Sequence, residues 1–215
     1  MPTVHGVPLS PFVRKVRVAL FEKGVSHDVV PTMPLPPAND DPAFRKMSPL
    51  GKIPAYEDGD FTISDSSVIL NYLESSEPKL LPDDAKQRAR ALWFEEFADS
   101  KLAENVGTVF FNRIVAPNIL KQAGDQAAID AALNEELPPL FDYLEGQLGD
   151  NEYLAAGRFT VGDVAVGSML RQFQFAGESV DAARWPKLAA YAERILSRPS
   201  FKTAADEENQ VAANM

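Results

Sequence analysis

The fold of this chain is decided by residues 53–66, which read IPAYEDGDFTISDS. Residues 55–57 and 60–63 are short strand patterns, and the Asp58-Gly59 pair between them is a strong signal for a hairpin turn. Ser64 or Asp65 then caps a helix that runs to about residue 75, since both residue types are favoured N-caps. The stretch therefore predicts an antiparallel hairpin followed directly by a helix.

Residues 1–47 add a parallel pair of strands to this hairpin. A short strand over 3–7 precedes a helix over about 11–23, where apolar residues recur with helical spacing, and a second strand is expected over 26–30. The proline-rich segment 31–42 is a loop, and a short helix follows it. Because strands linked through a helix pair in parallel, this part of the chain predicts a small mixed sheet with helices packed against it.

After Glu77 the composition changes, and helix patterns replace strand patterns. A long helix is expected over about 83–115, stopped before Pro117, and a second over about 126–146. The Pro138-Pro139 pair should kink or break the second helix, because an interior proline costs ~3 kcal/mol. Further helices are expected to begin at Thr160, near Trp185 or Pro186, and near Pro199.

The composition excludes several classes of function. The net charge is −10, from 21 basic and 31 acidic residues, which argues against sequence-independent binding of nucleic acid. No stretch approaches the roughly 20 apolar residues of a membrane-spanning helix, and the first residues show no signal peptide, so we expect a cytoplasmic protein that does not bind membranes. The absence of cysteine excludes disulfides and a cysteine nucleophile, and the spacing of His5 and His27 predicts no metal site.

Ser10-Pro11 is the first candidate for a functional site. Serine is a favoured N-cap and proline is favoured at the first helical position, so capping alone explains the pair. Ser10 also follows the first strand, at the carboxyl end of a sheet, where ligands tend to bind in open α/β folds. Its hydroxyl and the positive end of the helix would stabilise an anion there, including a thiolate.

Two further pairs complete the candidate site. Pro54 either opens a strand, where its missing donor is tolerated, or follows a cis bond that turns the N–H and C=O of Ile53 outward toward a peptide-like ligand. Asp65 and Ser66 stand in a run of four polar residues at a helix start, more than one cap requires, and would bind a carboxylate and an ammonium group. With Ser10, these pairs predict a ligand with an amino-acid end, a peptide middle and a thiol.

Five stretches resemble the glutathione transferase superfamily. Residues 9–20, LSPFVRKVRVAL, resemble the Ser-type active-site helix of its bacterial cytosolic members. Residues 48–54, SPLGKIP, are similar to the family's Asn-Pro-x-Gly-x-Val/Ile-Pro, with Ser48 in place of the usual Asn. Residues 65–73, DSSVILNYL, resemble its Glu/Asp-Ser-x-Ala-Ile-x-x-Tyr-Leu helix. Residues 160–163, TVGD, resemble the capping box of its central helix, and residues 198–201, RPSF, its closing motif.

The resemblance implies an α/β plus all-α fold. Residues 1–77 would form a thioredoxin-like domain that binds glutathione, 78–84 a linker, and 85–215 a helical bundle that contributes the second-substrate site. Glutathione would be the cosubstrate, no metal would be used, and the protein would be a homodimer. The expected activity is that of a glutathione S-transferase acting on a small apolar electrophile. Isomerisation, dehalogenation, ether cleavage, and a non-enzymatic interaction role are the alternatives.

The resemblance also assigns roles to residues. Ser10 would be the catalytic residue at the glutathione sulfur, Ile53 with its cis Pro54 would pair with the peptide, and Asp65 and Ser66 would hold the γ-glutamyl end. Lys52 would either reach the glycyl carboxylate or remain solvated.

The helical half gives weaker signals. Position alone places four residues near the second substrate: Phe12, Phe110, Phe111 and Arg113. An aromatic pair on a helix, such as Phe110 and Phe111, is also typical of a core. Asp99 is a candidate contact to the γ-glutamyl amine in the partner subunit. The tail after Thr203 is expected either to cover the second-substrate site or to be disordered.

Overall fold

Four short strands form one mixed sheet in the first third of the chain. In the computed structural model, which describes residues 1–213, the strand order is β2-β1-β3-β4. β1 (Thr3–His5) pairs in parallel with β2 (Asp28–Val30) and antiparallel with β3 (Ala55–Asp58), which forms the hairpin with β4 (Phe61–Ser64). The predicted β-α-β, loop, β-β-α order is therefore confirmed.

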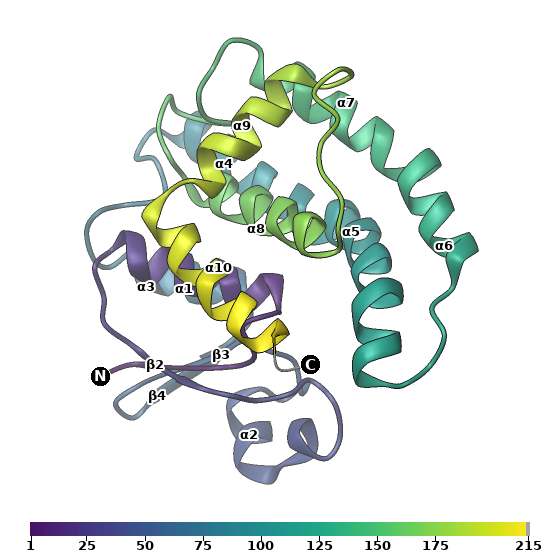
Figure 1. Cartoon of the computed structure of the whole chain (residues 1–215). Helices are drawn as coiled ribbons and strands as arrows, with labels where there is room; N and C mark the ends of the chain where they lie inside the picture. Colours follow the sequence, from purple (N-terminus) through teal and green to yellow (C-terminus); the bar gives the residue numbers. More distant parts are fainter. Residues whose placement is uncertain (214–215) are drawn as a thin grey trace. The chain divides into compact units, whose positions relative to one another are not determined.

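Helices cover both faces of this sheet (Figure 1). α1 (Pro11–Glu22) and α3 (Ser66–Leu73) lie on one face, and α2 (Pro42–Met47) lies on the other, after a short 3₁₀ turn at Ala38–Asp40. The sheet and α1 share a core to which Val4, Val16 and Tyr56 contribute, all of them buried. This is the thioredoxin-like arrangement expected for the first domain.

The first compact unit contains residues 1–80 together with Pro199–Val211, and the second contains Leu81–Arg198. This division differs from the expected one, which assigned the whole of 85–215 to the helical domain. The physical reason is that the last helix, α10 (Pro199–Ala212), forms ion pairs with α1 through Glu207 and Glu208. For the described residues after Thr203, the same contacts contradict the disordered alternative, and the alternative of a cover over the second-substrate site stays a prediction.

The second unit is all-helical, and none of its described helices, nor any in the rest of the described chain, is long and apolar enough to cross a membrane. Its centre is α8, which is buried at every position from Val161 to Leu170. The α-helices of the unit are α4 (Ala85–Phe97), α5 (Ala103–Phe110), α6 (Gln126–Ala131), α7 (Leu137–Leu148), α8 (Val161–Phe175) and α9 (Pro186–Leu196).

The proline predictions for this unit are partly wrong. The chain stays helical through Pro117, because it widens into a π-helical segment over Phe111–Ile119 in which the N–H of Leu120 donates to the carbonyl five residues before it, 3.0 Å away. π-helical segments also occur at Ala98–Leu102 and Ala132–Glu136. The segment Ala132–Glu136 interrupts the regular α-helix just before α7, whose first turn contains Pro138 and Pro139. The predicted interruption of this helix near the two prolines is therefore confirmed.

Thr160 and Asp163 form the predicted capping box at the start of α8. The Asp163 carboxylate accepts hydrogen bonds from the backbone N–H of Leu154 and Thr160 and from the hydroxyls of Thr160 and Tyr191, at 2.9–3.0 Å. Burial raises the pKa of Asp163, and these hydrogen bonds act in the opposite direction. Asp163 therefore links the start of the central helix to the preceding loop at Leu154 and to Tyr191 on α9.

Candidate functional site

The strand register brings the three predicted pairs to one edge of the sheet. His5 on β1 is opposite Ala55 on β3, and Ala55 is opposite Ser64 on β4. The chain that leaves β1 toward Ser10, the chain that enters β3 and the chain that leaves β4 therefore all lie at the same end of the sheet. Sequence reasoning placed each pair separately, and the register unites them.

The backbone at Gly6 is closely packed against Val13 and Ile53 at this edge. A Cβ built at Gly6 would lie 2.4 Å from Val13 Cγ2 and 3.4 Å from Ile53 Cβ, so the residue after β1 has space for glycine only. This close approach holds the loop before Ser10 against α1 and against the loop before β3. Sequence reasoning missed it, because an isolated glycine at a strand end has many possible causes.

Ser10 is the N-cap of α1, as the capping interpretation predicts. Its Oγ accepts from the N–H of Val13 at 3.4 Å, which is long for a hydrogen bond, and the side chain is half-buried. The hydroxyl proton is directed at no described residue, so Ser10 can cap its helix and still donate to a ligand.

Ile53 precedes a cis peptide bond to Pro54. The backbone N–H and C=O of Ile53 form no hydrogen bond to any described residue, which leaves both available to an extended peptide. Ser48 fixes this loop, because its Oγ donates to the Lys52 carbonyl at 2.7 Å and accepts from the Lys52 N–H at 3.1 Å. The serine that replaces the usual asparagine thus has a bracing role that the sequence did not reveal, while the Lys52 side chain is exposed.

Asp65 and Ser66 begin α3 with different tasks. Asp65 has a positive φ of 81° and accepts from the N–H groups of Ser67 and Val68 at 3.0 and 3.2 Å, so it is a cap in a strained conformation. Ser66 is buried, and neither its N–H nor its hydroxyl has a partner among the described residues. The helix start therefore keeps donors for a carboxylate.

A buried lysine lies close to this helix start. Lys15 on α1 is fully buried, and its Nζ donates to the Oγ of Ser67 at 3.4 Å. Its positive charge adds to that of the α3 N-terminus. Sequence reasoning missed Lys15, because it stands among other basic residues in a segment whose exposed face could not be distinguished from its buried one.

The predicted second-substrate residues have mixed surroundings. Phe110 packs edge-on against Phe175 with ring centroids 5.9 Å apart, whereas Phe111 is 46% exposed. Arg113 forms an ion pair with Glu178 at 2.6 Å, which favours a structural use of this side chain. Phe12 belongs to the first unit and is half-buried on α1.

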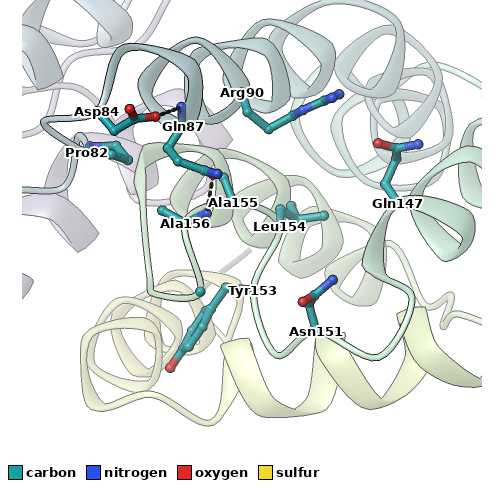
Figure 2. Close-up of a pocket in the computed structure, with 11 residues that line it drawn as sticks. Pro82, Asp84, Gln87, Arg90, Gln147, Asn151, Tyr153, Leu154, Ala155 and Ala156 are labelled. Atoms are coloured by element: carbon teal, nitrogen blue, oxygen red, sulfur yellow. Dashed lines mark hydrogen bonds between the residues drawn. The ribbon is translucent and has the colours of Figure 1, made fainter.

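The helical unit also contains an open cavity of about 570 Å³ (Figure 2). Three side-chain amides contribute to its lining, and one of them, Gln87, accepts from the N–H of Ala156 at 3.0 Å. The cavity is lined by Pro82, Asp84, Gln87, Arg90, Gln147, Asn151, Tyr153, Leu154, Ala155, Ala156 and Gly157. None of the predicted site residues is among them. All of its lining residues belong to the helical unit.

Comparisons with known proteins agree with this geometry. A family model described as the glutathione S-transferase N-terminal domain matches residues 4–81, and one described as the C-terminal domain matches residues 126–194. Glutathione S-transferase 3 of Zea mays is 33% identical over 94% of this chain and 92% of its own length. Among solved structures, glutathione transferase F7 of Populus trichocarpa is 25% identical with a TM-score of 0.84, covering 96% of this chain and 99% of its own.

A theta class glutathione S-transferase of Xanthomonas axonopodis, solved with glutathione bound, is 28% identical with a TM-score of 0.79 and covers 94% of this chain and 96% of its own. The fold and these relationships define a two-domain protein with a thioredoxin-like and a helical part. The chain belongs to the glutathione S-transferase family of enzymes.

Proposed function

We propose that this enzyme transfers glutathione to a small apolar electrophile and that Ser10 stabilises the attacking thiolate. The observation that carries the proposal is the set of unused hydrogen-bonding groups at one edge of the sheet: the Ser10 hydroxyl, the Ile53 backbone, and the N–H and hydroxyl of Ser66. Glutathione has a thiol, a peptide and an α-amino acid end that match them. The Xanthomonas relative with bound glutathione supports this choice of ligand.

Ser10 acts on the sulfur through a hydrogen bond and a helix dipole. The hydroxyl donates to the thiolate, and the N-terminus of α1 adds partial positive charge. Because one pKa unit corresponds to ~1.4 kcal/mol, these two effects are enough to ionise a thiol near neutral pH. This is the Ser-type chemistry of the bacterial members that residues 9–20 resemble.

The remaining contacts hold the rest of the tripeptide. The N–H and C=O of Ile53 pair with the cysteinyl backbone as an added strand would, with Pro54 fixing their direction. Ser66 donates to the γ-glutamyl carboxylate, Asp65 accepts from the γ-glutamyl ammonium, and Lys52 reaches the glycyl carboxylate. This binding places the thiolate so that positioning and charge stabilisation supply the catalysis.

The electrophile contacts Phe12, Phe110, Phe111 and Arg113 in this proposal. The exposed Phe111 is the best supported of the four, since Arg113 already has Glu178 as its partner. The active form is a homodimer in the cytoplasm, in which the half-buried Asp99 of one subunit contacts the γ-glutamyl amine in the other.

Binding of glutathione tests the proposal first. The chain should bind immobilised glutathione and gain thermal stability in millimolar glutathione, because a ligand that binds only the folded state stabilises it. A chain that does neither is an interaction protein that has lost the site.

The role of Ser10 is tested by the ultraviolet absorbance of the bound thiolate against pH. The thiol pKa should be lowered in the wild type, raised in Ser10→Ala and close to wild type in Ser10→Thr, which keeps a hydroxyl. An unchanged pKa in Ser10→Ala would reduce Ser10 to a cap. A panel of aryl halides, epoxides, isomerisable double bonds and aryl ethers then separates conjugation from the alternative reactions.

A further inference from the structure

The active-site helix α1 is paired with the C-terminal helix α10 through charged side chains. Arg14 on α1 forms an ion pair with Glu208 on α10, and Arg17 forms a bidentate pair with Glu207 at 2.5 and 2.6 Å. At the far end of α1, Ser200 donates to Glu22 at 2.5 Å. Figure 1 shows α10 alongside α1, in the same compact unit.

These contacts fix the direction of α10. Ser200 lies beside Glu22 and Glu208 beside Arg14, so eight residues of each helix, about 12 Å, run past one another in opposite directions. α10 therefore advances toward the N-terminus of α1, where Ser10 is the cap. Its last charged residue, Glu208, meets α1 one turn from that cap.

The Arg14–Glu208 pair is buried, and Arg14 belongs to the first turn of the helix that Ser10 caps. Both side chains are 1% exposed, whereas Glu207 is 39% exposed. The N–H of Arg14 donates to the carbonyl of Ser10 at 2.9 Å, and helical side chains point back toward the N-terminus, so the guanidinium lies over the turn that Ser10 begins. Buried charges are little screened by water or salt, so both act on an anion bound there.

Stability alone does not account for buried charges at this position. Apolar side chains of similar size would hold α10 against α1 at least as well, because taking two charges out of water costs several kcal/mol that their attraction often fails to recover. A guanidinium stays charged at all relevant pH values, so Arg14 favours the thiolate at Ser10. The Glu208 carboxylate opposes that effect.

We propose that the opposing charges of Arg14 and Glu208 together set the ionisation of the thiol bound at Ser10, so that the C-terminal helix tunes the reactivity of glutathione. The inference rests on the proposed function. The charged neighbours on the packed elements are Lys15 and Arg17 on α1 and Glu207 on α10, with His27 accepting from Arg17 at 3.3 Å. Of these, only Glu207 is changed below, in the control variant.

The test is a thiolate titration of the full-length chain saturated with glutathione. Glu208→Gln removes one buried negative charge beside Arg14, so the apparent pKa of the bound thiol should fall by about half a unit to one unit. Glu207→Gln is the matched control on the same helix, and its partly solvated charge should leave the thiol pKa within about 0.2 unit of wild type. Structural damage to the site would raise the thiol pKa toward that of free glutathione, which is the opposite sign.

A second background keeps the test valid if Glu208→Gln does not fold. Arg14→Gln should raise the thiol pKa, and the double variant Arg14→Gln/Glu208→Gln should have a lower thiol pKa than Arg14→Gln alone, close to that of wild type. This inference alone would be overturned if the wild type lowers the thiol pKa but removal of Glu208 does not lower it further. That result would be an unchanged or raised thiol pKa in Glu208→Gln relative to wild type, or in the double variant relative to Arg14→Gln. A wild type that binds glutathione without lowering its pKa would overturn the proposed function as well.

Discussion

Two helix starts in this molecule have similar chemistry and opposite surroundings. At α8, the Asp163 carboxylate is fully buried and accepts four hydrogen bonds from backbone and side chains. At α1, Ser10 is half-buried and accepts one long hydrogen bond from Val13. The first start uses all its hydrogen-bonding capacity within the protein, and the second keeps a donor in reserve.

The difference separates a cap whose hydrogen-bonding groups are all used within the protein from one that can still donate to a ligand. A saturated, buried cap leaves nothing for a ligand, so its loss should reduce stability. A cap with a spare donor and partial exposure contributes little to stability and is suited to binding. Four predictions follow this contrast, in order of the size of the expected effect.

The largest effect is expected for Asp163→Ala. The substitution leaves the N–H groups of Leu154 and Thr160 and the Tyr191 hydroxyl buried without their acceptor, at about 1–3 kcal/mol each, so the free energy of unfolding should fall by at least about 3 kcal/mol. Urea unfolding measures it. Asp163→Asn keeps one acceptor oxygen and should lose less. A loss below about 1 kcal/mol for the alanine variant would remove the distinction between the two helix starts.

Gly6→Ala should destabilise the chain by about 1–3 kcal/mol, since the new methyl group would meet Val13 Cγ2 at 2.4 Å. Gly107→Ala is the control: nothing lies within 4 Å of a Cβ built there, in the interior of α5, and the change should stabilise by about 0.5–1 kcal/mol. Thermal unfolding of both variants gives the comparison. Equal effects of the same sign would show that the edge beside Ser10 is not tightly packed.

Ser10→Ala should reduce the free energy of unfolding by only about 1 kcal/mol, the usual effect of losing one N-cap. Turnover should fall far more, by about 10²–10³ in kcat, if the hydroxyl stabilises the reacting sulfur. Ser10→Thr should recover most of both. A stability loss comparable with that of Asp163→Ala would mean that the two starts share one structural role.

The smallest effect concerns pH and His27, next to the α1–α10 contact. Burial lowers the pKa of His27 below 6.5, and the neutral ring fits its contacts, with Nε2 accepting from Arg17 and Nδ1 donating to the Val25 carbonyl. The unfolded chain therefore binds this proton at a higher pH than the folded chain does. The contribution of His27 is complete above pH 6.5 and is lost as the pH falls below it.

This dependence is measured as the difference in urea stability between wild type and His27→Gln from pH 7.5 to 5. As the pH falls, the free energy of unfolding of the wild type should decrease relative to that of His27→Gln. His5→Gln controls for the loss of an imidazole. A difference that stays constant over this range would contradict the neutral state of His27.

Much of the fold could be predicted because its signals are local. The hairpin at Asp58-Gly59, the capping box at Thr160 and the prolines that open α9 and α10 each act within a few residues of themselves. The continuation of helix through Pro117 could not be predicted, because it depends on a change to π-helical hydrogen bonds that the residue pattern does not encode.

Part of the candidate site could also be predicted, because some of its residues stand beside local sequence signals. Ser10, Ile53 and Asp65 stand beside strong turn and cap signals, whereas Lys15 and Ser48 owe their positions to contacts made across the fold. The pairing of α1 with α10 joins residues nearly 200 positions apart, and acidic residues near a chain end usually indicate a solvated tail. Long-range partners of this kind are what a sequence alone does not identify.

The return of α10 to α1 has a consequence for how the chain is made. The ribosome releases Arg14 194 residues before Glu208, and Arg17 190 residues before Glu207. The helical unit, residues 81–198, is complete before the thioredoxin-like unit can acquire its final helix. During synthesis the helical unit therefore emerges in full before α10 can pair with α1 beside Ser10.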